Sequence, residues 1–260
     1  MKLAALTNPQ HNLLDEITWI ATNGFACIDL VLEAPGATLE NADWSAVQAA
    51  IVASGLPVIC RAASYLPIHN PSPHVRQAAA DELRRSIDAA QLVGSTLLTT
   101  SFLGWPAYMN EAVGYEYYRQ LYELLLRHGH ERGVQVALEN SPNNTHQLKW
   151  FREIYQRLPT LKHVYNLGHG NVQTRQSLTR EHLFALNDRL VHVRLSDNDG
   201  VSNGCLPLGA PANGGIDWPR DLRILRSFRY EGTMTLEIGG ERRWLLASAQ
   251  WLRERWEQAG

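Results

Sequence analysis

The sequence has few cysteines, no excess of charge of either sign and no long apolar run. Its three cysteines (Cys27, Cys60 and Cys205) are far apart and form no Cys-x-x-Cys pair, which argues against a disulfide framework or a structural zinc site and favours a reducing compartment. The net charge of -2, from 24 Lys and Arg against 26 Asp and Glu, provides no basic surface for a nucleic acid. No run approaches the ~18 apolar residues of a membrane span, and the first residues lack the apolar core of a signal peptide. We therefore expect a cytoplasmic protein that binds neither nucleic acid nor membrane.

What the sequence does contain is a regular alternation of short apolar runs and amphipathic helical stretches. We expect eight strands, at residues 2–7, 25–32, 57–62, 96–101, 134–139, 162–166, 190–196 and 233–238. We expect eight helices, near residues 11–22, 43–54, 74–93, 113–132, 145–157, 179–187, 219–229 and 241–257. Strand followed by helix eight times, without a break in composition, predicts an α/β fold, a single (β/α)₈ TIM barrel domain over residues 1–260, and such barrels typically take ~250 residues.

This architecture predicts where the chemistry lies. In such barrels the reacting groups project from the C-terminal ends of the strands, and the opposite rim serves stability. The candidate site residues at these ends are Arg61, Tyr65, Trp105, Glu139, Asn166, His169, Arg194, Asp197 and Glu237. Along the strand before the loop at residues 197–217, His192, Arg194 and Ser196 share one face, and we expect His192, one layer deeper, to be a hydrogen-bonded core residue.

The stretch from residue 190 to residue 218 carries a family resemblance. It reads Leu-Val-His-Val-Arg-Leu-Ser-Asp-Asn-Asp-Gly, later Gly-Cys-Leu-Pro-Leu-Gly, and then Gly-Gly-Ile-Asp-Trp. It resembles the segment His-Leu-Ser-Asp-Asn, Asp-x-His-Leu-Pro-Leu-Gly and Gly-x-Ile-Asp-Trp of xylose isomerase-like sugar phosphate isomerases and epimerases, relatives of endonuclease IV. The runs Ala-Leu-Glu-Asn ending at Asn140 and Thr-Leu-Glu-Ile ending at Ile238 match the two strand-end glutamates of that family. The resemblance implies a TIM barrel that acts on a small sugar.

The same resemblance implies a degenerate metal site. The simpler isomerases of the family hold one metal by Glu, Asp, His and Glu, and the matching residues here are Glu139, Asn166, Arg194 and Glu237. The further zinc-ligand positions of endonuclease IV match Arg61, Ser101, His169, Asn203 and Cys205, of which only His169 is retained.

An arginine has no lone pair to offer a metal and keeps its proton in proteins. Two carboxylates and one guanidinium carry the same net charge, -1, as three carboxylates and a divalent cation. We hypothesise that Arg194 takes the place of the metal and that the barrel holds no metal and no cofactor.

The function that follows is an isomerase or epimerase of a small sugar, polyol or hydroxy-carbonyl compound. Glu139 or Glu237 would remove a proton beside a carbonyl group and the other would return it, while Arg194, helped by Asn166 or His169, would stabilise the developing oxyanion. We expect Arg61, Tyr65, Trp105 and Asp197 to contact substrate, although Asp197 could equally cap its own loop.

Other interpretations stay open from the sequence. A lyase would use the same two carboxylates. A metal could be retained by Glu139, His169, Glu237 and the Asn166 amide oxygen, with Arg194 binding substrate anions. Loss of catalysis would leave a binding or partner subunit, with Glu139 and Glu237 in a structural ion-pair network. Trp244 and Trp251, seven residues apart on the last helix, make a homodimer possible.

Overall fold

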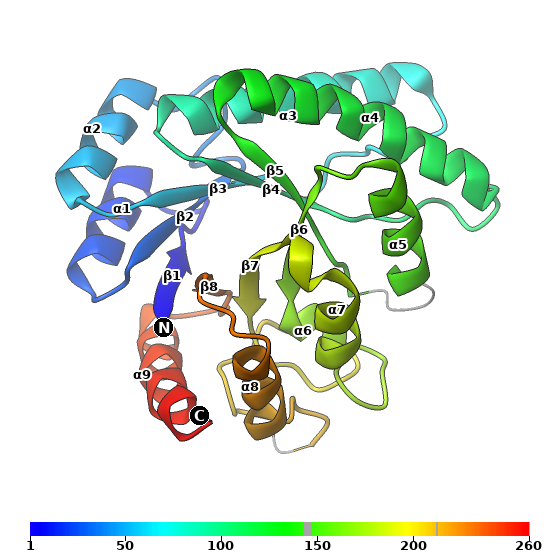
Figure 1. Cartoon of the computed structure of the whole chain (residues 1–260). Coiled ribbons are helices and arrows are strands. Elements are labelled where there is room, and N and C mark those ends of the chain that lie inside the picture. The colour runs from blue at the N-terminus through cyan, green and yellow to red at the C-terminus, as the bar shows by residue number, and fades with distance from the viewer. Residues whose placement is uncertain (143–146, 212, 260) are drawn as a thin grey trace. The chain divides into compact units, whose positions relative to one another are not determined.

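The protein is described by a computed structural model that covers residues 1–142, 147–211 and 213–259. Eight parallel strands form one closed barrel in sequence order, so the predicted TIM barrel is confirmed (Figure 1). The strands are β1 (Lys2–Leu6), β2 (Cys27–Leu32), β3 (Val58–Ala62), β4 (Leu97–Ser101), β5 (Gln135–Glu139), β6 (Lys162–Asn166), β7 (Leu190–Leu195) and β8 (Thr233–Leu236). The predicted strand limits differ from these by at most two residues.

Helices follow the strands as the periodicity predicts. They are α1 (Leu13–Thr22), α2 (Trp44–Ser54), α3 (Pro73–Leu92), α4 (Glu111–Arg132), α5 (Gln147–Arg157), α7 (Thr179–Leu186), α8 (Trp218–Ser227) and α9 (Arg242–Gln258). The expected start of the fifth helix, at residue 145, lies outside the described residues. Two short elements were not predicted: α6 (Leu167–Asn171) and the 3-10 turn η1 (Asn187–Arg189).

Local chemistry explains several helix ends. The Asn12 side chain accepts hydrogen bonds from the backbone N–H groups of Leu14 and Asp15 at the start of α1, and Asp217 accepts one from Arg220 at the start of α8. These bonds satisfy N–H groups that have no partner inside the helix. At the end of α4, Gly133 has φ of 68°, a left-handed conformation that glycine adopts without a steric penalty.

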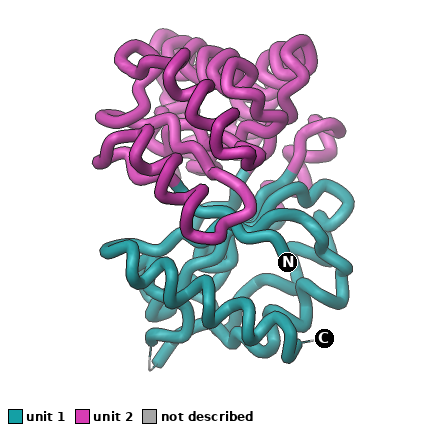
Figure 2. Tube along the Cα trace, turned by 90° about the vertical axis from the view of Figure 1, so that its left-hand side faces the viewer, with its two compact units in different colours: residues 1–6, 139–148, 163–260 teal, residues 7–138, 149–162 magenta. Residues whose placement is uncertain are grey.

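The chain groups into two compact units (Figure 2). The first unit contains residues 1–6, 139–148 and 163–260, and the second contains residues 7–138 and 149–162. In the first unit β7 pairs with β6 on one side and with β8 on the other, and β8 pairs with β1. In the second unit β3 pairs with β2 and β4. The expectation of a single domain over residues 1–260 stays a prediction.

The strands are buried on both faces, as barrel strands enclosed by helices must be. Every residue of β2 and β3 is buried, which explains the nearly continuous apolar runs in the sequence. Among the described residues, no helix combines the length and apolar character needed to cross a membrane.

Candidate active site

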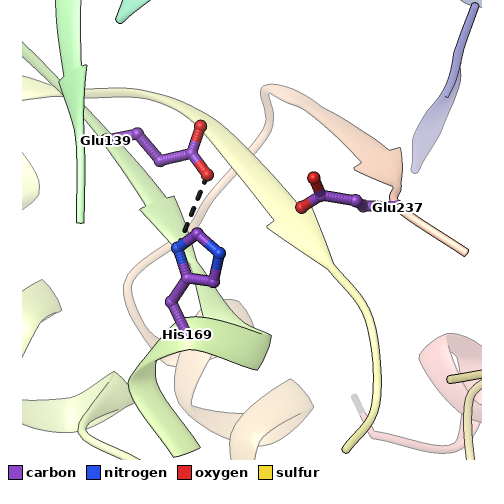
Figure 3. Close-up of side chains that lie close together, drawn as sticks. All are labelled: Glu139, His169 and Glu237. Atoms are coloured by element: carbon purple, nitrogen blue, oxygen red, sulfur yellow. Dashed lines mark ion pairs between the residues drawn. The ribbon is translucent and has the colours of Figure 1, made fainter. Parts of the chain in front are cut away.

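The predicted central residues lie together in the first unit, at the ends of strands that are neighbours in the barrel. Glu139 ends β5, Asn166 ends β6, and Glu237 directly follows β8. In the register of the sheet Arg194 lies opposite Asn166 on β6 and opposite Thr235 on β8. Because side chains two residues apart point to the same face, Glu237 shares the face of Thr235. Figure 3 shows the carboxylates of Glu139 and Glu237 directed toward the ring of His169.

The Asn166 amide joins the two carboxylates. Its Nδ2 donates to Glu139 Oε1 at 2.9 Å and to Glu237 Oε2 at 2.7 Å. Its Oδ1 accepts from the backbone N–H of His169 at 3.1 Å. A backbone N–H can only donate, so this contact fixes which side of the amide faces the glutamates. Asn166 therefore presents donors, and not a lone pair, to the space between them.

Arg194 forms an ion pair with Glu139, from Nη1 to Oε2. The guanidinium is 0 % exposed and the Glu139 side chain 1 % exposed. A buried charge without a partner is strongly unfavourable, so each of these residues requires the other. Asn166 is also buried, whereas Glu237 is half-buried and is the more accessible of the two carboxylates.

The short helix α6 holds His169 beside this pair. His169 Nδ1 contacts the backbone oxygen of Asn140 at 2.6 Å and lies 3.7 Å from Glu139 Oε1. Because a carbonyl oxygen only accepts, Nδ1 carries a proton, and in the neutral ring the lone pair is then on Nε2. This tautomer is suited to accepting a hydrogen bond from a substrate hydroxyl.

Asn140 is a contributor that the sequence did not single out as a site residue. Its Oδ1 accepts from the backbone N–H of Asn166 at 2.6 Å, and its Nδ2 donates to the backbone oxygen of Asn166 at 3.0 Å. The side chain thus bonds the backbone of Asn166 much as a neighbouring strand would, while the Asn140 carbonyl orients His169. Its position directly after Glu139 at a strand end was the available signal.

His192 occupies the layer beneath Arg194, as predicted. It is fully buried, and its two ring nitrogens contact the hydroxyl groups of Thr233 at 2.9 Å and Thr235 at 2.8 Å. Burial lowers the pKa of His192 to about 3, with a further contribution from the positive charge of Arg194. The ring is therefore neutral at physiological pH.

Asp197 serves as the anchor of the loop at residues 198–217. Its carboxylate accepts hydrogen bonds from the backbone of Asn198, Gly209 and Ile216, at 2.9, 2.8 and 3.2 Å, and from the Trp218 indole at 2.6 Å. A carboxylate can accept about four hydrogen bonds, so these four donors use all the acceptor sites of Asp197. The structure supports the loop-capping interpretation, and substrate contact by Asp197 stays a prediction.

The other three predicted substrate contacts lie in the second unit. Arg61 is a buried residue of β3, and Tyr65, on the loop that follows, is 62 % exposed. Trp105 packs with its ring centroid 4.6 Å from that of Trp150 and 5.1 Å from that of Tyr115. It also covers Gly114 so closely that a Cβ there would lie 2.3 Å from the indole. The Trp105 ring is thus fixed by packing, and substrate binding by these three residues stays a prediction.

Comparison with known proteins agrees with this architecture. The family model described as xylose isomerase-like TIM barrel matches residues 17–255. The chain belongs to the xylose isomerase-like TIM barrel family. No curated protein matches the chain.

Several solved structures share the fold of this xylose isomerase-like barrel. A D-tagatose 3-epimerase-like protein has a TM-score of 0.87 and 19 % identity, over 100 % of this chain and 98 % of that one. The 3-keto-D-glucoside 4-epimerase YcjR from E. coli has a TM-score of 0.78 and 19 % identity, over 98 % and 99 % of the two chains. An L-ribulose 3-epimerase has a TM-score of 0.82 and 12 % identity, over 100 % and 96 %. At these identities the likeness shows the fold alone.

The four-ligand metal set expected for the family does not fit the residues of this chain. Arg194 places a guanidinium against Glu139, and Asn166 directs its amide donors at both glutamates. Neither group is a metal ligand in this arrangement, since a cation needs lone pairs. A set of three residues is better suited to holding a metal ion. One ligand atom each from Glu139, His169 and Glu237 lie within 4.8 Å of one another.

Proposed function

We propose that this barrel is an isomerase or epimerase of a small sugar or related hydroxy-carbonyl compound, and that it moves protons with two glutamates while Arg194 stands where relatives hold a metal. The observation that carries the proposal is the bridge from Glu139 through the Asn166 amide to Glu237, with Arg194 paired to Glu139. Sugar epimerases among the solved structures of the same fold support the substrate class.

The chemistry begins with removal of a proton from the carbon beside a carbonyl group. The half-buried Glu237 is the carboxylate that a substrate entering the site would meet first, and a general base must be within reach of its proton. For epimerisation, Glu139 would have to carry a proton of its own, which it would deliver to the opposite face of the enediolate and so become the carboxylate that Arg194 stabilises. For isomerisation, Glu237 would return the proton that it removed to the adjacent atom. Arg194 supplies positive charge near the developing oxyanion, and such a preorganised cation can contribute several kcal/mol. The Asn166 amide holds the two glutamates in place, and His169 can accept a hydrogen bond from a substrate hydroxyl.

Exchange of substrate hydrogen with solvent tests the proposal. Ketoses such as D-allulose, D-tagatose and L-ribulose, incubated with the protein in deuterated water, should take up deuterium at the carbon beside the carbonyl. Glu139→Gln and Glu237→Gln should each reduce this exchange at least ~100-fold, the scale of a lost general acid or base. The matched control is Glu241→Gln, an exposed glutamate that pairs with Arg243 and should leave exchange unchanged. Wild-type exchange rates in either active-site variant would contradict the proton-transfer roles, and no exchange by the wild type would favour a binding or partner subunit.

A metal-dependent isomerase or lyase is the second candidate, favoured by the closeness of Glu139, His169 and Glu237. In our proposal Arg194 provides the positive charge, so the purified protein should contain far less than one equivalent of Mn, Mg or Zn. Arg194→His should raise metal affinity, because imidazole supplies a lone pair where the guanidinium has none. Elemental analysis of both proteins decides the point: one tightly bound ion per wild-type chain would replace the proposal with the metal-dependent candidate.

A further inference from the structure

A cavity lies at the barrel rim where the strands begin, opposite the strand ends that carry the candidate active site. It has a volume of about 320 Å³ and is formed where β1 and β8 begin and where α8 and α9 end. Its lining residues all belong to the first unit, and they include Lys2, Arg226, Arg229, Glu231 and Trp256. Pockets that bind small ligands begin at about this size. The rim at the N-terminal ends of the strands is where barrels usually carry only stabilising residues.

The cavity has an excess of positive charge. Lys2, Arg226 and Arg229 line it against a single acid, Glu231, so the charges of the lining side chains sum to +2. Within the part of the chain that the structure describes, none of these four side chains forms an ion pair with another residue. Arg226 is instead oriented by neutral groups: its Nη1 donates to the backbone oxygen of Trp256 at 2.8 Å, and its guanidinium carbon lies 5.4 Å from the centroid of the Trp256 ring.

Arg229 occupies a backbone position that does not suit arginine. Its φ is 53°, and it follows the end of α8 with the bond pattern of a Schellman cap, from Arg229 N to Arg226 O at 2.8 Å and from Tyr230 N to Leu225 O at 3.2 Å. Glycine is the usual residue here, and a side chain with a Cβ costs roughly 1 kcal/mol in this conformation. Such local strain points to a role for the side chain.

The dipole of α8 does not account for the whole cluster. A cation near a helix C-terminus is favourable, and Arg226, in the last turn of α8, already occupies that place. Lys2 comes from a different element, at the start of β1, and adds its charge to the same cavity. Three exposed cationic side chains from two separate parts of the chain therefore line one cavity, and the helix dipole accounts for only one of them.

We propose that this cavity binds a phosphate dianion, either inorganic phosphate or the phosphate group of a small monoester. A dianion would balance the charge of +2, and arginine guanidinium groups match the geometry of phosphate oxygens bidentately. The volume leaves space beside the phosphate for a small organic group against Trp256. This site is separate from the glutamates and does not depend on the proposed isomerase activity.

Thermal unfolding of the full chain, at matched ionic strength in inorganic phosphate, glycerol 3-phosphate or chloride, tests the site. The wild-type Tm should rise saturably with either phosphate compound and not with chloride, because a ligand that binds only the folded state stabilises it. Arg229→Gly should weaken phosphate binding at least about tenfold, as expected for loss of a charged hydrogen bond. Without phosphate this variant should be no less stable than the wild type, because glycine relieves the strained φ.

The control is Arg243→Gln, which removes an exposed cation that lies over Trp244 and outside the cavity. It should keep the full phosphate response. Tighter binding of glycerol 3-phosphate than of inorganic phosphate would identify a monoester as the ligand, and equal binding would identify phosphate itself. The proposal is overturned if phosphate and chloride give the same wild-type Tm, or if Arg229→Gly retains the wild-type response.

Discussion

At the scale of single residues, the candidate active site is organised by hydrogen-bond donors. Two carboxylates brought close together in a buried site would repel, and one would take up a proton. Here the Asn166 amide donates to both of them and the Arg194 guanidinium pairs with Glu139. Removal of Arg194 without replacement would leave Glu139 as an uncompensated buried charge, which is why a cation at this point serves the fold as well as the proposed chemistry.

His192 makes stability depend on pH. Burial lowers the pKa of His192 from the ordinary value of 6.5 to about 3 in the folded state. Between these two pH values, His192 carries a proton in the unfolded chain and is neutral in the folded chain. The folded state therefore has its full free energy of unfolding above pH 6.5, and the part linked to His192 is lost as the pH falls toward 3. Between pH 7 and pH 5 the loss attributable to His192 should be about 2 kcal/mol.

Urea unfolding at the two pH values measures this loss. In His192→Gln, which has no titrating group at that position, the decrease in the free energy of unfolding from pH 7 to pH 5 should be smaller than in the wild type by that amount. Equal decreases in the two proteins would show that His192 does not contribute.

At the scale of elements, a buried amide network connects α6 to the loop at residues 198–217. The Asn198 side chain donates to the backbone oxygen of Gly168 at 2.7 Å and accepts from Asn171 Nδ2 and from the backbone of Gly200, both at 2.9 Å. Gly168 is tightly enclosed, since a Cβ there would lie 2.3 Å from the Ser196 hydroxyl. The network therefore sets the position of the helix that carries His169.

Asn198→Ala should lower the free energy of unfolding by roughly 2–3 kcal/mol, because it leaves buried partners without their hydrogen bonds. It should also impair the proposed exchange reaction through displacement of His169. Ser202→Ala, on the exposed part of the same loop, is the control and should stay within about 0.5 kcal/mol of the wild type. Chemical denaturation and exchange rates measured on both variants check the network, and wild-type stability of Asn198→Ala would contradict it.

At the scale of the whole molecule, the eightfold alternation of strand and helix closes into a barrel, and the family assignment covers most of the chain. The site residues that the structure brings together all belong to the first unit, whereas Arg61, Tyr65 and Trp105 belong to the second. The homodimer stays a prediction: Trp244 is 44 % exposed, while Trp251 packs edge-on against Trp218 at 5.9 Å. The cytoplasmic location stays a prediction as well.

The sequence by itself determined the order and limits of the main elements, because the periods of buried residues in strands and helices are local properties of the chain. It also placed Glu139, Asn166, Arg194 and Glu237 at strand ends. It did not predict α6, whose sequence Leu-Gly-His-Gly-Asn has two glycines and is too short to show a helical period.

Only the tertiary structure decided how the polar side chains are used. The Asn166 amide faces the glutamates because the His169 backbone takes its oxygen, and Asp197 is satisfied by donors as far along the chain as Gly209 and Trp218. Hydrogen bonds of this kind join residues that the fold brings together from distant positions. No local pattern of residue types records them, so the contacts of the site residues are set only when the tertiary structure forms.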